Sequence, residues 1–104
     1  MKDYKIMLLC AGGMSTSILM KKLEKYAKEN ELGLSIEAVG LSSTSYISEA
    51  KKFDVILMGP QVSYRLDEVK QATGKPVEAI NPTDYALGNA KNIFDLADKL
   101  LKTI

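Results

Sequence analysis

The sequence predicts an α/β domain with a single four-stranded parallel sheet, strand order 2-1-3-4, and helices on both faces of the sheet. Segments typical of strands alternate with segments typical of helices along the chain, and such alternation favours parallel strands joined by helical crossovers. With 104 residues, of which 46% are hydrophobic, the chain is long enough for one buried core and too short for two domains. Residues 1–104 are therefore interpreted as one domain.

The first half of the chain predicts two strands and two helices. Tyr4–Leu9, apolar except for Lys5, is typical of a buried strand. Residues 15–30 carry apolar side chains at three- and four-residue spacing, which predicts an amphipathic helix. Its expected inward stripe is Ile18, Leu19, Leu23, Tyr26 and Ala27. Leu34–Val39 alternates in the manner of an edge strand. A short helix over 45–51 follows, and its cap is Ser42, Ser43 or Thr44.

A second buried strand and a third helix follow. The run DVILM at 54–58 predicts the strand, which ends at Gly59-Pro60 because proline fixes φ and lacks an N–H donor. A helix is predicted over 62–72, with Gly74 just past its end. Its inward residues are Val62, Leu66 and Val69.

The C-terminal part predicts one more strand and one more helix. Residues 76–80 form a short strand, and Asn81-Pro82-Thr83-Asp84 is predicted as a turn in which Asp84 is a cap. The last helix covers 90–102 with Asn89 as its N-cap. Its inward stripe is Ile93, Phe94, Ala97, Leu100 and Leu101.

The composition excludes several classes of function. Fourteen basic and 13 acidic residues are interleaved, which argues against a nucleic-acid-binding face. With one cysteine and no histidine, neither a zinc or iron site nor an internal disulfide is expected, and no cofactor is indicated. A reducing cytoplasm is the expected compartment. No apolar run approaches the ~20 residues of a membrane helix, so in transport another polypeptide would cross the membrane. A monomer is expected, and Met1 favours a free-standing subunit.

The stretch LLCAGGMSTS at 8–17 predicts an anion site with a nucleophile beside it. Gly12 and Gly13 permit positive φ and leave backbone N–H groups accessible, just before a helix N-terminus that attracts anions. Cys10 precedes them, and a helix N-terminus favours the thiolate form of a cysteine. A lone cysteine after a buried strand is often an inert packing residue. The glycines and the three hydroxyl residues that follow argue against that reading.

Comparison with cysteine phosphatases helps to distinguish phosphate hydrolysis from phosphoryl transfer at Cys10. Those enzymes use C-x5-R-S after a strand, and their arginine grips the phosphate. Here Thr16 stands at the arginine position and Ser17 follows it, while the single arginine, Arg65, lies elsewhere. G-x-G-x-x-G and G-x-x-x-x-G-K-[ST] motifs are absent, as is a histidine base. A phosphoryl carrier that binds but does not hydrolyse is therefore favoured. A low-molecular-weight cysteine phosphatase and a non-enzymatic anion-binding regulatory module are the alternatives.

Three motifs together carry a family resemblance: I-M-L-L-C-A-G-G-M-S-T-S at 6–17, V-I-L-M-G-P-Q-V-S-Y at 55–64 and K-P-V-E-A-I at 75–80. In them the chain resembles the enzyme IIB component of the lactose, cellobiose and chitobiose class of the bacterial phosphoenolpyruvate-dependent sugar phosphotransferase system. The resemblance implies a fold like that of low-molecular-weight tyrosine phosphatases. It also implies that Cys10 takes a phosphoryl group from a phosphohistidine of a IIA protein. The group then passes to a disaccharide-type sugar bound by a IIC membrane permease.

The resemblance also implies residue roles. Cys10 would be the phosphorylated nucleophile. The phosphate cradle would comprise Ala11, Gly12, Gly13, Met14, Ser15, Thr16 and Ser17. Met14 is also a candidate partner contact. Gln61, Ser63 and Tyr64 would flank the site or contact a partner. Asp84 could mimic a phosphatase general acid, although the capping role is preferred. Lys21 and Lys22 would either steer an anionic partner or form an ordinary solvated surface. The sugar is not readable from the sequence.

Overall fold

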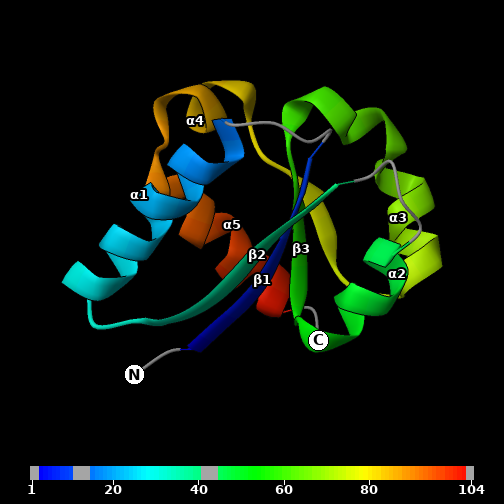
Figure 1. Cartoon of the computed structure of the whole chain (residues 1–104), viewed down its shortest axis with the longest axis horizontal. Coiled ribbons are helices and arrows are strands. Elements are labelled where there is room, and N and C mark those ends of the chain that lie inside the picture. Colours follow the sequence, from blue (N-terminus) through cyan, green and yellow to red (C-terminus); the bar gives the residue numbers. More distant parts are fainter. Residues whose placement is uncertain (1–2, 11–14, 41–44, 103–104) are drawn as a thin grey trace.

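The computed structural model describes residues 3–10, 15–40 and 45–102. Its sheet consists of β1 (Asp3–Cys10), β2 (Gly33–Gly40), β3 (Val55–Met58) and β4 (Val77–Ala79). All neighbouring strands are parallel, in the order β2-β1-β3-β4 (Figure 1). The predicted topology is confirmed, including β2 as an edge strand.

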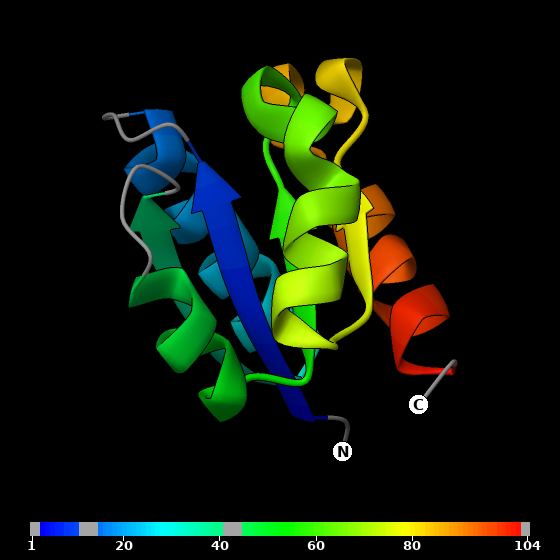
Figure 2. The ribbon, with the colours of Figure 1, turned by 90° about the vertical axis from the view of Figure 1, so that its right-hand side faces the viewer.

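The helices cover both faces of the sheet (Figure 2). They are α1 (Ser15–Glu29), α2 (Ser45–Glu49), α3 (Leu66–Thr73), α4 (Pro82–Leu87) and α5 (Ala90–Leu101), with 3-10 helices η1 (Ala50–Lys52) and η2 (Pro60–Arg65). Alternate residues of β1 supply the two cores: Ile6 and Leu8 pack with α1 and α5, whereas Met7 and Leu9 pack on the side of α2 and α3. No helix among the described residues is long and apolar enough to span a membrane.

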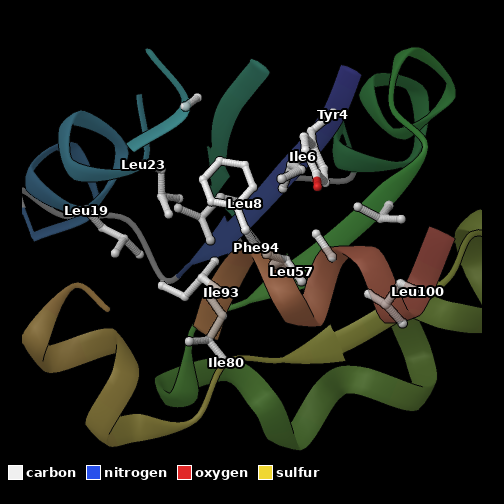
Figure 3. Close-up of a cluster of buried hydrophobic side chains, with 13 residues drawn as sticks. Tyr4, Ile6, Leu8, Leu19, Leu23, Leu57, Ile80, Ile93, Phe94 and Leu100 are labelled. Carbon is white, nitrogen blue, oxygen red and sulfur yellow. The ribbon is translucent and has the colours of Figure 1, made fainter. Parts of the chain in front are cut away.

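The core under α1 and α5 is centred on aromatic side chains (Figure 3). Phe94 of α5 makes an edge-to-face contact with Tyr4 at a centroid distance of 4.9 Å and stacks on Tyr26 at 5.2 Å. The buried Tyr4 hydroxyl donates a 2.8 Å hydrogen bond to Asp98 Oδ1. This bond joins the start of β1 to α5, so a polar atom in the core has the partner it needs.

The stability of the domain is expected to fall at alkaline pH because of Tyr4. Burial and the hydrogen bond to Asp98 raise the pKa of Tyr4 well above its usual value. Above pH about 10 the unfolded chain therefore ionises this phenol while the folded chain does not, which favours unfolding by up to about 1.4 kcal/mol per pH unit. Urea unfolding across this pH range should show a shallower loss for Tyr4→Phe than for the unmodified chain.

The matched control is Tyr64→Phe, because Tyr64 is exposed. At neutral pH, Tyr4→Phe should cost about 0.5–1.5 kcal/mol through loss of the bond to Asp98. Parallel alkaline curves for the unmodified chain and Tyr4→Phe would contradict the assignment to Tyr4.

Three helical expectations need correction. Residues 81–84 are not merely a turn: Asn81 caps α4 by accepting a 2.8 Å bond from the Thr83 N–H, and Pro82 pre-sets the first helical φ. Asp84 is therefore not the cap. The helix predicted over 62–72 is divided, since Pro60 starts the 3-10 turn η2 and α3 begins only at Leu66. Ile18 is 61% exposed, because it lies in the first turn of α1, at the edge of the sheet rather than over it.

The other helix ends follow their sequence signals. Gly74 ends α3 with φ +68°, and Asn89 caps α5 by accepting from the Asn92 N–H at 3.4 Å. The helix expected over 45–51 is α2 followed by η1. Its candidate caps at 42–44 lie outside the described residues.

Candidate functional site

The candidate site lies where β1, β3 and β4 end at one edge of the sheet (Figure 1). Cys10 is the last residue of β1. The Gly59 N–H donates to the Leu9 carbonyl at 2.9 Å, and the Ile80 N–H donates to the Met58 carbonyl at 2.8 Å. The first bond brings the segment after β3 beside the end of β1, and the second places the end of β4 beside the end of β3. Ligands of parallel α/β sheets bind at this kind of edge, where neighbouring connections leave to opposite faces.

The sheet holds the backbone of Cys10. Cys10 pairs in register with Gly40 of β2, and its Sγ lies 4.0 Å from the Val39 carbonyl oxygen. Only 6% of the residue is exposed. The thiol is free, and α1 begins at Ser15, five residues along the chain. Cys10 therefore stands between the end of β1 and the start of α1, and its role as a nucleophile stays a prediction.

The predicted phosphate cradle falls mostly outside what the structure describes. Ala11, Gly12, Gly13 and Met14 lie outside the described residues, and the cradle stays a prediction. Ser15 and Thr16 form the first turn of α1, followed by Ser17, which is exposed. The structure therefore confirms a strand-to-helix transition across this motif.

The three residues predicted to flank the site all lie in η2, directly after β3. The Gln61 side chain turns back over Gly59, because its Oε1 lies 3.0 Å from the position that a Cβ atom would take there. The Ser63 hydroxyl donates to the Pro60 carbonyl at 3.1 Å and so stabilises η2 itself. Tyr64 is 82% exposed and projects to solvent. Gln61 is thus placed beside the strand of Cys10, whereas Tyr64 points outward.

Sequence reasoning missed Tyr85. This residue of α4 places its ring Cε2 3.5 Å from the Cβ position of Gly59, on the same edge of the sheet as Cys10. It is half-buried against the core under α1 and α5. The available signal was Pro82 after an asparagine, which marks a helix start as readily as a turn.

A depression of about 150 Å³ lies between α1 and α4. Its lining residues are Ile18, Leu19, Lys22, Tyr85, Ala86 and Gly88. Leu87, at the end of α4, is 66% exposed. Ile18 and Leu87 therefore present apolar surface close to the edge of the sheet where Cys10 lies. Such surface is typical of sites that contact another molecule.

The arginine, the aspartate and the two lysines considered in the sequence analysis do not form a cluster of charges at Cys10: three of the four make contacts elsewhere. Arg65 donates to Glu68 through Nε at 3.1 Å and through Nη2, and this hydrogen bond raises the pKa of the guanidinium. Asp84 Oδ1 accepts from Asn92 Nδ2 at 3.0 Å and thereby joins α4 to α5. Lys21 is exposed, and Lys22 Nζ donates to the Leu87 carbonyl at 3.1 Å. Residues 3–10, 15–40 and 45–102 contain no group of three or more potential metal ligands.

Comparison with known proteins decides the family. Residues 5–96 match the family described as "PTS system, Lactose/Cellobiose specific IIB subunit". The chain belongs to this IIB family. It is 34% identical to the galactose-specific EIIB component of Lactococcus lactis subsp. cremoris, over 97% of this chain and 99% of that protein. The family places it among the phosphotransferase components of bacterial sugar uptake.

Two further relatives extend this IIB assignment. The solution structure of a cellobiose-specific phosphotransferase IIB component from Borrelia burgdorferi superposes with a TM-score of 0.77 at 35% identity, covering 95% of this chain and 93% of that one. The predicted fold type, that of low-molecular-weight tyrosine phosphatases, is thus confirmed. The lactose-specific EIICB component of Lactococcus lactis is 30% identical over 71% of this chain, which corresponds to 13% of that longer protein.

Proposed function

We propose that this IIB chain is a phosphocarrier in which Cys10 holds the phosphoryl group between a donor protein and a sugar. The observation that carries the proposal is the place of Cys10 at the end of β1, five residues before the start of α1. In the chain this is the single cysteine, and there is no histidine. Cys10 is thus the residue to which a nucleophilic role is assigned.

The transfer consists of two displacements at phosphorus. The Cys10 thiolate attacks the phosphoryl group on a histidine of a IIA protein; the N–P bond breaks, an S–P bond forms, and the released imidazole takes up a proton. A sugar hydroxyl oxygen then attacks the same phosphorus, the S–P bond breaks, and the thiolate leaves. Because the chain has no histidine, the base that accepts the hydroxyl proton is assigned to the membrane partner.

The cradle over residues 11–17 would bind the phosphoryl oxygens through backbone N–H groups and hydroxyls. The N-terminus of α1, a fifteen-residue helix, would add the positive end of the helix dipole to this phosphate site. This grip lacks the bidentate arginine of a phosphatase, because Thr16 occupies that position and Arg65 is hydrogen-bonded to Glu68. A carrier needs such a milder grip, since water attack on the phosphocysteine would waste the group.

The proposed partners are a IIA protein, as donor, and a IIC membrane permease. The EIICB relatives join the two components by name in one protein, which supports action beside a IIC component. Ile18, Leu87 and Tyr64 supply exposed apolar surface for docking, with Gln61 and Ser63 at the same edge. The sugar would be a disaccharide of the lactose, cellobiose or chitobiose type. The carrier would act as a cytoplasmic monomer without a cofactor.

The testing experiment is intact-mass analysis after incubation with phosphoenolpyruvate, the general phosphotransfer proteins and a IIA partner. A single added phosphoryl group that is lost when the sugar and a IIC permease are supplied is the expected result. Aryl phosphate hydrolysis is measured in parallel and should be absent. No added mass with an active IIA donor, together with aryl phosphate turnover, would favour the phosphatase. The absence of both phosphoryl uptake and aryl phosphate hydrolysis would favour the anion-binding module.

A further inference from the structure

We propose that Lys22 is a positioning residue: it ties α1 to the end of α4 and so holds Tyr85 against the strand end beside Cys10. The contact of Lys22 with the end of α4 can be tested without reference to phosphoryl transfer. Its consequence for phosphoryl transfer rests on the proposed function.

The contact between Lys22 and α4 is close and specific. Lys22 Nζ donates a 3.1 Å hydrogen bond to the carbonyl of Leu87, the last residue of α4. A Cβ atom at Gly88 would lie 2.3 Å from Lys22 Cδ and 2.9 Å from Nζ, so the lysine stem lies directly on the glycine. Gly88 also has φ +64°, where glycine is favoured. The backbone conformation thus favours glycine here, and a larger residue would also displace the end of the Lys22 side chain.

The Lys22 ammonium group stabilises the C-terminal end of α4. The last carbonyls of a helix have no partner within the helix and carry its negative end, and a lysine there satisfies both. The helix α4 has only six residues, and none of its side chains is fully buried. Its position therefore depends on ties such as Asp84 to α5 and Lys22 to α1.

What α4 positions is the Tyr85 ring. Tyr85 Cε2 lies 3.5 Å and the Leu9 carbonyl oxygen 3.7 Å from the Cβ position of Gly59. The Gly59 N–H bonds that same carbonyl, and Leu9 precedes Cys10. One series of contacts therefore runs from α1 through Lys22, α4, Tyr85 and Gly59 to the strand of Cys10. Residues 15–17 of the Cys10 motif form the start of α1. The contact of Lys22 with α4 therefore sets the distance between α1 and the Tyr85 ring, which lie on two sides of the site.

The test compares Lys22→Met, which keeps the stem and removes the ammonium, with Lys21→Met, which makes the same charge change on an exposed neighbour. In a spectrum of 15N-labelled protein, Lys22→Met should shift the Gly59 and Gly88 amide resonances, because the Tyr85 ring current acts on Gly59. Lys21→Met should leave both resonances in place, and Lys22→Arg should restore them. The urea midpoint should change little, because the bond is exposed.

The kinetic arm measures Cys10 phosphorylation against donor concentration. Lys22→Met should lower the maximal rate by about tenfold with the half-saturating donor concentration unchanged, since loss of positioning acts on the transfer step. Tyr85→Leu should lower it similarly, and the double variant should be no worse than Tyr85→Leu alone. A salt-sensitive rise in half-saturation shared with Lys21→Met would instead show steering and overturn the proposal.

The two arms keep this inference separate from the proposed function. Unmoved Gly59 and Gly88 resonances in Lys22→Met overturn the tie whatever the transfer assay shows. If the unmodified chain takes up no phosphoryl group, the proposed function fails while the shifted resonances still support the tie. Shifted resonances with an undiminished maximal rate overturn the positioning role.

Discussion

Cys10→Ser is expected to abolish phosphoryl uptake, lowering its rate by about 10⁴-fold or more. A serine hydroxyl is a weak nucleophile unless an adjacent base removes its proton, and the chain has no histidine to do so. A cysteine sulfur, by contrast, is intrinsically a strong nucleophile and needs no histidine base. The measurement is the intact mass of both chains over time with the same donor.

The serine variant should fold like the unmodified chain, which makes the comparison clean. Serine replaces sulfur with a smaller oxygen, which can also donate a hydrogen bond toward the Val39 carbonyl that Sγ approaches at 4.0 Å. Circular dichroism and the urea midpoint provide the control. Cys10→Ala should be equally inactive. Uptake at an undiminished rate by a folded Cys10→Ser chain would place the phosphoryl group on another residue and refute the carrier mechanism. Unchanged anion binding by this variant would fit the regulatory module.

Much of the fold was predictable because local and long-range preferences agree along most of the chain. The apolar runs that form most of β1 and all of β3 are typical of strands buried on both faces, and these strands form the centre of the sheet. The alternating segment that forms β2 lies at the edge, as its exposed polar side chains require. Gly74 and Asn89 end and begin helices where their chemistry places them.

The helix α4 was missed because its own residues supply only part of its stability. A six-residue segment has too few hydrogen bonds to form a helix alone and needs tertiary contacts. Those contacts come from Lys22, sixty-five positions before Leu87 in the chain, and from Asn92 of α5. Neither pairing leaves a periodic signal. The exposure of Ile18 has the same origin, since the helical pattern shows a stripe but not where the sheet beneath it ends.

In the candidate site, too, some residues could be proposed from the local sequence, whereas others are placed only by the tertiary fold. Cys10 and the motif after it could be proposed as a site because the chemistry is local: a strand end, glycines and a helix start within eight residues, and their role stays a prediction. The place of Tyr85 beside Gly59 depends on the order β1-β3-β4 and on how α4 is held. Gln61 was predicted at this edge, but the return of its side chain over Gly59 follows from the 3-10 turn at Pro60.

Phe94→Ala is expected to have the largest effect on stability, about 3–5 kcal/mol. The side chain is buried in the core under α1 and α5 beside Tyr4 (Figure 3), and its ring contacts the rings of both Tyr4 and Tyr26. Alanine would leave a cavity and remove two aromatic pairs, each contributing about 0.5–1.5 kcal/mol beyond burial. A domain of this size has about 5–15 kcal/mol in total, so the variant should be close to its unfolding threshold.

Urea unfolding followed by far-UV circular dichroism measures the effect, with Phe94→Leu as the matched control. Leucine fills most of the volume without the ring contacts, and it should cost less than half as much as alanine because the cavity is smaller. If the alanine variant is unfolded without urea, the leucine variant still reports the packing, and its midpoint should lie below that of the unmodified chain. Equal midpoints for all three chains would contradict this prediction. They would mean that Phe94 does not join β1 to α1 and α5, because removal of a buried ring from that junction should leave a destabilising cavity.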